Sequence, residues 1–494
     1  MSRHPAHKLL DGRLGGWDAQ GRLPPHRGAT RDLSSDLRIV PPYYTMITHD
    51  AIFRLSAFRE DVYRCFGRRR DALCDLMDAI ASAGPRPSIA HLSLAPAHRR
   101  GWGSVYAALR RGDLDGAALR AVLLRHPLEG GQPVYAVDVS VWPRCDAATS
   151  PERGFYYHPS RHLDGTPVVK GWAYQWIAQL GFARESWTAP VDVQRVPLEQ
   201  TPTVAAIAQV KALLDRLPPS ATVPLFVFDA GYDQVELAHQ LGDASVALLI
   251  RLYSNRCFYA EPPPVTGTRE GRPRQDGATF ACDDPTTWPE PSATYRCEDE
   301  HYGAVWVQAW ANLHTPVRRP KGKGTYKPRP RVHGTIIRVE VARLPGQTRK
   351  PQVLWLWWQG GQRAGTPDLA FLWRAYVRRY DIEQTFRFLK GSLNWVTPRV
   401  RYPAQADLWT WLVAAAYTQL RLARACVIDQ HLPWERPQEA MTFTPERVQR
   451  GFVARLVELG TPAAPPNPCG RSPGRPKGRL SGRAPRFPAI KKSA

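Results

Sequence analysis

The chain has 494 residues, 43% of them hydrophobic, which is enough for two or three domains with a sizeable buried core. Its 67 Lys and Arg residues outnumber 44 Asp and Glu residues, and the formal charge of +23 predicts a polyanionic partner. Every apolar run is shorter than the ~20 residues of a membrane span, and the first residues lack the apolar stretch of a secretory signal. We therefore expect a cytoplasmic protein that acts on nucleic acid and not on a membrane.

The N-terminal quarter of the chain is predicted to be helical. Residues 1–45 are rich in Gly, Pro, Arg and His without periodicity, so we expect a disordered basic segment, and Met46 is an alternative start of the protein. Residues 46–128 alternate apolar stripes with Arg-rich faces at helical spacing. Such charged faces are usually only solvated, but in a chain this basic a helical DNA-binding domain is an equally good interpretation.

An α/β pattern follows over residues 131–257. The stretches QPVYAVDVSVW, ATVPLFVFDAGYD and SVALLIRLYSN predict strands by their β-branched content, and TPTVAAIAQVKALLDRL has helical periodicity. Strands that alternate with helices indicate an α/β domain. The eight cysteines include no CxxC pair and are too sparse for a disulfide scaffold, so we expect reduced thiols and no zinc site.

The α/β pattern is interrupted over residues 258–350, which are Pro-rich and basic and contain strand-like pieces such as AVWVQAW and HGTIIRVEVARL. This segment is predicted to be a β-rich basic insertion. The pattern resumes over residues 351–425 with VLWLWW and two helices, and a C-terminal helical segment covers residues 426–460. Residues 461–494 are expected to be a disordered basic tail.

Three carboxylates occupy unusual places in this pattern. Asp138 lies in the middle of a strand, Asp229 ends a fully apolar strand, and Glu383 lies on a later helix. Each alone has an ordinary explanation, as a strand-edge residue, a turn or cap residue, and half of a surface ion pair. Together they can converge at one edge of an α/β sheet, where a shared Mg²⁺ or Mn²⁺ would offset their repulsion.

The helix that carries Glu383 also shows a stripe of polar residues. At about 100° per residue, Tyr376, Arg379, Glu383 and Lys390 share an arc of about 60°. A helix exposed all round scatters its cations, so this stripe predicts a face that follows a nucleic-acid backbone, with Glu383 at the reacting phosphate.

The same residues resemble a known family. The spacing Tyr376-x2-Arg379-x3-Glu383-x6-Lys390 matches the Y-(2)-R-(3)-E-(6)-K signature of IS4-type (IS4/IS701-like) DDE transposases, and two Asp-bearing strands precede it in the family's order. The resemblance covers residues 46–460, and the strings AVDVS, DAGYD and, beyond that range, the C-terminal GRPKGR add to it.

The resemblance implies an RNase H-like catalytic domain with a β-rich insertion, preceded by a helical N-terminal domain. It implies that Asp138, Asp229 and Glu383 are catalytic and hold two Mg²⁺ ions, for which Mn²⁺ substitutes. The ions would activate water to cut an insertion-sequence end, and then the freed 3′-hydroxyl to attack another phosphodiester. The implied partners are double-stranded DNA, as transposon ends and target, and a second copy of the chain in the DNA complex, in the bacterial cytoplasm at the nucleoid. The residues implied to bind DNA are Tyr376, Arg379, Arg387 and Lys390.

Several other residues compete for roles in this scheme. Asp233 is a rival of Asp229, although its place past the strand favours a turn, and Asp146 is a weaker rival of Asp138. Some relatives stack a tryptophan of the insertion on a flipped base, for which the candidates are Trp288, Trp306 and Trp310, with core packing as the alternative for each.

The C-terminal tail contains SPGRPKGR (residues 472–479), which resembles the core of an AT-hook. This motif predicts DNA contacts by Arg475 and Lys477. The tail is compositionally biased, so non-specific attraction to phosphate is the safer interpretation.

Two other functions remain open on the sequence alone. One is an RNase H-fold nuclease that cuts DNA without strand transfer, and the other is a catalytically silent DNA-binding protein derived from a transposase. The complete set of three acids and the full helix signature favour the transposase.

Overall fold

The computed structural model defines the fold of most of the chain. It describes residues 42–86, 88–158, 167–183, 187–219, 222–264, 274–316, 329–346, 353–360, 366–468, 478 and 482–491, with side chains from residue 49 on. Contacts divide the chain into two compact units, Met1–Met46 and Ile47–Ala494, and the sheet and its helices belong to the second unit. Most of the N-terminal segment expected to be disordered, and the tail residues Arg475 and Lys477, lie outside the described residues.

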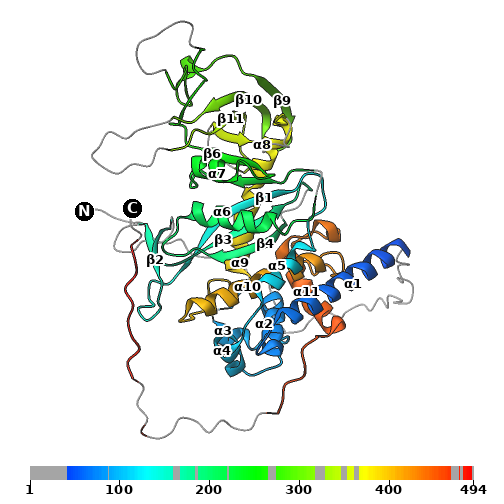
Figure 1. The fold of residues 1–494 in the computed structure, drawn as a ribbon. Coiled ribbons are helices and arrows are strands. Elements are labelled where there is room, and N and C mark those ends of the chain that lie inside the picture. The colour runs from blue at the N-terminus through cyan, green and yellow to red at the C-terminus, as the bar shows by residue number, and fades with distance from the viewer. Residues whose placement is uncertain are drawn as a thin grey trace, which may run out of the picture. The chain divides into compact units, whose positions relative to one another are not determined.

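A large mixed sheet forms the centre of the second unit (Figure 1). The twelve strands found among the described residues are β1 (Val134–Pro143), β2 (Gly154–Tyr157), β3 (Val168–Leu180), β4 (Thr188–Arg195), β5 (Leu225–Phe228), β6 (Ala247–Leu252), β7 (Cys257–Tyr259), β8 (Thr279–Ala281), β9 (Ala293–Asp299), β10 (Gly303–His314), β11 (His333–Val341) and β12 (Leu354–Gln359). The order β4-β3-β1-β5-β6-β12 runs through its middle; β3 is antiparallel to β4 and β1, whereas β1, β5 and β6 are parallel. The predicted α/β class is confirmed.

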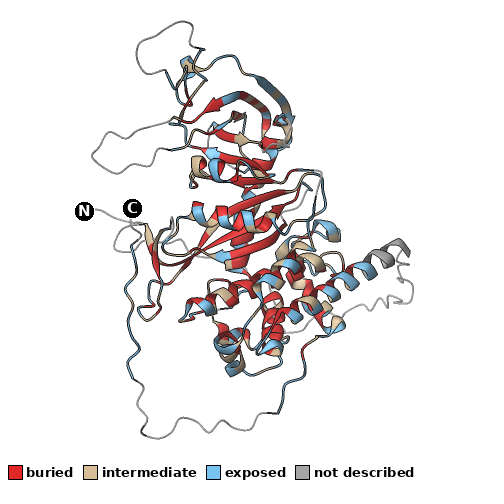
Figure 2. Cartoon of the chain, in the orientation of Figure 1, coloured by how far each residue is buried: buried red, intermediate tan, exposed pale blue. Residues whose placement is uncertain are grey.

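The helices found among the described residues are α1 (Pro42–Cys65), α2 (Arg70–Ala83), α3 (Ile89–Leu92), α4 (Trp102–Arg111), α5 (Gly116–Leu124), α6 (Pro202–Leu214), α7 (Gln234–Leu241), α8 (Leu369–Arg378), α9 (Tyr380–Gly391), α10 (Pro403–Ala423) and α11 (Pro445–Leu459). Helices α6 and α7 pack on one face of the sheet, and α9 and α10 on the other. The side chains of β5 alternate between the faces: Phe226 and Phe228 join the core of α6 and α7, and Leu225 and Val227 join the opposite core with α9 and α10. Figure 2 shows the central strands buried.

Two central strands, β3 and β4, were not predicted. The last ten residues of β3, Gly171–Leu180, are all buried, so the strand lacks the alternation of apolar and polar residues that reveals a half-exposed strand. No helix among the described residues is both long enough and apolar enough to cross a bilayer.

The insertion continues the same sheet. Strands β7 to β11 lie between β6 and β12 in sequence, and β12 returns to pair antiparallel with both β6 and β11. The hydrogen-bonded ladder is therefore continuous from β6 through β12 to β11 and β10, and Figure 1 shows the insertion strands above β6.

Helices from the two ends of the chain form one body. Helix α2 packs against α10 and α11, and the buried Arg59 guanidinium binds both carboxylate oxygens of Asp78 at 2.6 and 2.9 Å. Gln419 on α10 donates to the same carboxylate at 3.0 Å. The predicted N-terminal and C-terminal helical segments thus share a core.

Part of the C-terminal tail lies against the segment that precedes β2. The backbone N–H of Phe487 donates to the carbonyl of Ala148, and that of Ile490 donates to the carbonyl of Arg153, both at 2.8 Å. The buried Arg153 side chain returns a bond of 2.7 Å to the Phe487 carbonyl. This stretch extends the sheet edge at β2.

Candidate active site

The two aspartates come together because their strands are parallel neighbours. The β1–β5 ladder ends with Val137 opposite Phe228, so Asp138 and Asp229 are the next residues on adjacent strands. Such strands lie about 4.8 Å apart, which places both carboxylates at the same edge of the sheet. Asp229 is half-buried, and its Oδ1 accepts a bond of 2.9 Å from the backbone N–H of Gly231.

Asp138 is the most enclosed of the acids. Its side chain is 16% exposed, and burial raises the pKa of Asp138 to about 6. The nearby Arg379 opposes this effect, whereas Asp229 and Glu383 raise the pKa further. Its Oδ1 accepts from the backbone N–H of Val139 at 2.8 Å, and Oδ2 accepts from Arg379.

Glu383 approaches the same place from a helix. It lies in the first turn of α9, and its side chain is 43% exposed. Together with the effects of Asp229 and Glu383 on Asp138, this position shows that the three predicted acids converge.

Arg379 lies between the acids, where the sequence had predicted a residue facing a phosphate. It donates from Nη1 to Asp138 Oδ2 at 3.1 Å and from Nη2 to Glu383 Oε1 at 2.6 Å. Burial alone would lower the pKa of Arg379, but Asp138, helped by Tyr376, Glu383 and Asp229, raises it above its ordinary value. The guanidinium is therefore fully charged and holds the carboxylates together.

The predicted stripe is not on a single helix. Helix α8 ends at Arg378 and α9 begins at Tyr380, so Arg379 is the junction between them. Tyr376 is buried, Lys390 is half-buried with its ammonium 5.8 Å from the ring centroid of Trp395, and Arg387 is exposed. Only part of the stripe thus faces outward.

The donor set suits a divalent cation, because carboxylate oxygens are the ligands that Mg²⁺ and Mn²⁺ prefer. A second observation agrees with an ion at this place: the buried hydroxyl of Tyr232 has no hydrogen-bond partner. Burial, with the nearby Asp138 and Asp229, raises the pKa of Tyr232 well above its usual value. In this arrangement, however, no group of three or more Asp, Glu, His or Cys side chains among the described residues lies close enough together to hold a metal ion.

The rival aspartates have other roles. Asp233 is the N-cap of α7, where its Oδ1 accepts from the backbone N–H groups of Val235 and Glu236, and its Oδ2 pairs with Arg329 at 3.0 Å. Asp146 is exposed, and its nearest cation is Arg399 at 3.8 Å.

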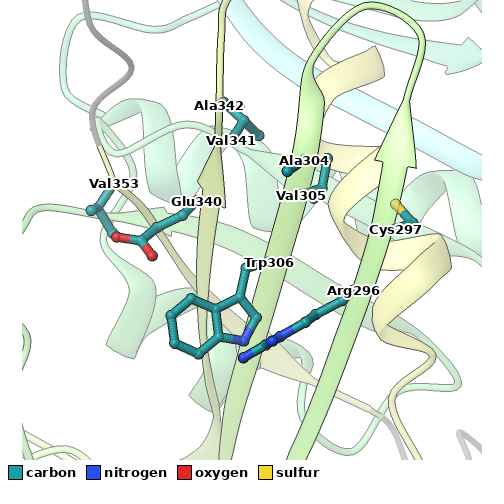
Figure 3. Close-up of a pocket in the computed structure, with 9 residues that line it drawn as sticks. All are labelled: Arg296, Cys297, Ala304, Val305, Trp306, Glu340, Val341, Ala342 and Val353. Carbon is teal, nitrogen blue, oxygen red and sulfur yellow. The ribbon is translucent and has the colours of Figure 1, made fainter.

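The three candidate tryptophans of the insertion lie away from the acids. Trp288 and Trp310 pack on each other, and their indole nitrogens donate to the backbone carbonyls of Ala281 and Pro289. The Arg296 guanidinium carbon lies 4.7 Å from the ring centroid of Trp306, and both residues line a cavity of about 730 Å³ (Figure 3). None of the three acids lines that cavity.

Sequence reasoning missed Tyr232 and Arg251. Tyr232 packs edge-on against Phe228 with ring centroids 5.1 Å apart, and Arg251 on β6 lies near Tyr376. The signal for Tyr232 was its place three residues after Asp229, in the turn that leaves the sheet edge. No sequence pattern marked Arg251.

The fold is mixed α/β, and the three acids approach one another at one edge of its sheet. Residues 61–310, just over half of the 494, match the sequence profile described as DDE superfamily endonuclease, and the chain belongs to this family. The expectation of a metal-dependent endonuclease of the DDE class is thereby confirmed. The match includes Asp138 and Asp229 and ends before Glu383.

Among solved structures, the chain is similar to a piggyBac transposase in a synaptic complex with hairpin DNA. The two sequences are 10% identical, the TM-score is 0.39, and the similarity covers 85% of this chain and 80% of the other. No curated protein matches the chain.

Proposed function

We propose that this protein is the transposase of an IS4-type insertion sequence, which cuts the ends of its transposon and joins them to target DNA. The observation that carries the proposal is the convergence of Asp138, Asp229 and Glu383 from two parallel strands and a helix. Membership of the DDE endonuclease family supports it. The strand order β4-β3-β1-β5-β6, with only the last three parallel, supports an RNase H-like core interrupted by the insertion.

Asp138, Asp229 and Glu383 would hold two Mg²⁺ ions, with Mn²⁺ as a substitute. When bound, the ions would supply Lewis-acid activation of water and of a DNA 3′-hydroxyl. Asp138 and Asp229 are fixed by the sheet, whereas Glu383 reaches the site from the more exposed α9. Arg387 is exposed on α9 one turn beyond Glu383 and would bind a DNA phosphate, as would Lys390. The buried Tyr376 would set the position of Arg379.

The N-terminal helices offer a second surface for DNA. A pair of backbone contacts joins the turn before α2 to the turn after α4, since Gly67 N–H donates to the Asp113 carbonyl and Asp113 N–H to the Arg68 carbonyl. Five exposed arginines gather at these two turns, which we call the arginine cluster: Arg68, Arg69, Arg70, Arg110 and Arg111. Within the cluster, Arg68 pairs with the carboxylate of Asp113 at 3.2 Å.

The arginine cluster supports DNA binding by residues 46–128, because such a density of cations attracts phosphates at physiological salt. We expect the cluster to hold transposon-end DNA while the acids act on the reacting phosphate. Two ends would be joined by a dimer of the chain on DNA, in the bacterial cytoplasm.

A supercoiled plasmid that carries the gene with its native flanking DNA tests the proposal. Purified protein and Mg²⁺ are added, and wild type is compared with Glu383→Gln. The matched control is Glu446→Gln, another exposed glutamate in the first turn of a helix, α11. We expect excised and joined DNA from wild type and the control, and a loss of about 1,000-fold in Glu383→Gln, or about 4 kcal/mol of transition-state stabilisation.

The other outcomes identify the alternatives. Cut but never joined DNA from wild type would indicate a nuclease without strand transfer. Equal binding of DNA by all three proteins, with no cleavage by any, would contradict catalysis and favour a silent DNA-binding protein.

A further inference from the structure

The Arg379 guanidinium lies between Asp138 and Glu383, two of the proposed metal ligands. It is 10% exposed and binds one oxygen of Asp138 and one of Glu383, thereby linking a strand to a helix across 241 residues of sequence. Each of these two carboxylates therefore presents one oxygen to the guanidinium.

We propose that Arg379 is an exchangeable internal cation: it neutralises the carboxylates until DNA arrives, and a DNA phosphate then draws it away and frees them for metal. The inference rests on the proposed function, because it requires Asp138, Asp229 and Glu383 to be the metal ligands. It implies that DNA and metal ions bind cooperatively, and that the free protein binds metal weakly.

Electrostatics favours the binding of either the Arg379 guanidinium or a divalent metal ion at these carboxylates, but not of both. Asp138 is nearly enclosed, so it must be neutralised by a proton or by a cation at hand. Arg379 supplies one positive charge to Asp138 and Glu383 with Asp229 beside them. A divalent ion on the same oxygens would repel the guanidinium, and it would also take both of its acceptors. Both cations cannot keep these contacts at once.

The position of Arg379 in the chain allows the exchange. It is the residue between α8 and α9, where the N–H of Ile382 bonds to the Arg379 carbonyl at 3.1 Å, a tight turn instead of a continuous helix. Its partner Glu383 is 43% exposed, so the ion pair is open to solvent on the side of Glu383, although Arg379 itself is buried. A small rotation of this long side chain carries it toward solvent.

A DNA phosphate is a suitable second partner for the released side chain. A guanidinium forms paired hydrogen bonds to phosphate as readily as to carboxylate. Arg387, exposed one turn beyond Glu383, would hold the same backbone. Because binding free energies are linked, DNA must then raise the affinity for metal by the same factor by which metal raises the affinity for DNA.

The alternative is a purely structural ion pair. A structural pair predicts that removing Arg379 destabilises the protein and weakens metal binding, because it loosens the acids. The exchange predicts the opposite effect on metal, since removing the internal cation leaves the acids free to bind it.

The test measures free Mn²⁺ by electron paramagnetic resonance during titration of the full chain, with and without a duplex of the transposon end whose scissile phosphate is replaced by a non-cleavable linkage. Arg379→Gln removes the charge and keeps hydrogen-bonding capacity. The matched control is Arg374→Gln, an exposed arginine of α8 that contacts none of the acids.

For wild type and Arg374→Gln we expect DNA to tighten Mn²⁺ binding about tenfold, within the usual range of coupled sites. Without DNA, Arg379→Gln is expected to bind Mn²⁺ about tenfold more tightly than wild type does. Addition of DNA should change the Mn²⁺ affinity of Arg379→Gln by less than about twofold. Unchanged or weaker Mn²⁺ binding by Arg379→Gln without DNA, or an unchanged effect of DNA, would overturn the exchange.

Two further variants make the result unambiguous. Asp138→Asn reports on the proposed function: if it binds Mn²⁺ as wild type does, the acids are not the metal site, and both proposals fail. If Asp138→Asn loses Mn²⁺ but Arg379→Gln shows no gain, only the exchange fails. Should Arg379→Gln not fold, Arg379→Lys, which cannot fork between two carboxylates, must bind Mn²⁺ at least a few-fold more tightly than wild type.

Discussion

Individual buried tyrosine hydroxyl groups in this protein differ in how much they contribute to the free energy of unfolding. The Tyr174 hydroxyl donates to Asp407 at 2.7 Å, whereas the Tyr232 hydroxyl has no partner. Removing a bonded buried hydroxyl costs about 1–2 kcal/mol, and removing an unsatisfied one is close to neutral. In metal-free buffer we therefore expect Tyr174→Phe to lower the free energy of unfolding by that amount, and Tyr232→Phe to change it by less than about 0.5 kcal/mol.

Urea unfolding followed by tryptophan fluorescence measures both changes. Tyr135→Phe is the control for Tyr232→Phe, because Tyr135 stacks on Phe226 of β5 as Tyr232 packs on Phe228, at the other end of that strand. A loss in Tyr232→Phe as large as in Tyr174→Phe would show that the Tyr232 hydroxyl is bonded in the free protein.

Some residues of the candidate site could be predicted from the sequence, and others could not. Asp138 and Asp229 stood out as candidates because a charge within or directly after an apolar strand is unusual. Glu383 stood out by its place in the polar stripe of a helix. The Arg379 contacts could not be identified in this way. Its partner Asp138 lies 241 residues away, and local spacing only placed Arg379 on the same helical face as Glu383.

At the scale of elements, the register of β1 and β3 depends on one glycine. A Cβ added at Gly171 would lie 2.2 Å from the Trp142 carbonyl oxygen, which belongs to backbone and cannot yield cheaply. Gly171→Ala should therefore lower the free energy of unfolding by at least about 2 kcal/mol, as overpacking does. It should also reduce DNA cleavage, because β1 carries Asp138.

The control for this substitution is Gly103→Ala. Gly103 is on α4 with no heavy atom within 4 Å of an added Cβ, so alanine should stabilise the helix by about 0.5–1 kcal/mol. The melting temperatures of both variants, compared with that of wild type, test these two expectations. If Gly171→Ala melts like wild type, the close approach of β1 and β3 is not required for the fold.

Elements differed in how well the sequence predicted them. The strands at β1, β5 and β6 and the helix α6 follow from apolar runs bounded by turn residues. The break between α8 and α9 does not, because no Pro or Gly lies near Arg379 and the apolar periodicity continues through it. Strand β3 was hidden by burial on both faces.

At the scale of the whole molecule, the helices of the two chain ends form a joint core that no local pattern could predict. The buried pair of Arg59 and Asp78, with Gln419 donating to the same carboxylate, joins segments more than 300 residues apart. Removing only one partner leaves a buried charge, which is strongly destabilising, so these contacts hold α1, α2 and α10 together.

His126 lies where this core meets the sheet, and it makes the stability depend on pH. Its ring packs edge-on against Phe58 at 5.2 Å, and its carbonyl accepts from Arg421. Burial, with Arg421 and Arg125, lowers the pKa of His126 from about 6.5 to about 4, while Asp61 opposes this.

Because the folded pKa is depressed, the contribution of His126 to stability is fully present above pH 6.5 and is lost as pH falls toward 4, where only the unfolded state gains a proton. This shift corresponds to about 3 kcal/mol, and solvent screening of the partly buried ring reduces the expected loss to about 1–2 kcal/mol. Asp138 and Asp381 act in the opposite direction over the same range, since burial raises the pKa of each to about 6. The comparison of wild type with His126→Gln therefore isolates the histidine.

Urea midpoints at pH 7.5 and 4.5 should show His126→Gln less stable than wild type at the higher pH because it lacks the ring contact with Phe58. The gap should narrow by about 1–2 kcal/mol at the lower pH because glutamine does not titrate. A gap that is the same at both pH values would mean that His126 takes up its proton in the folded protein as readily as in the unfolded chain.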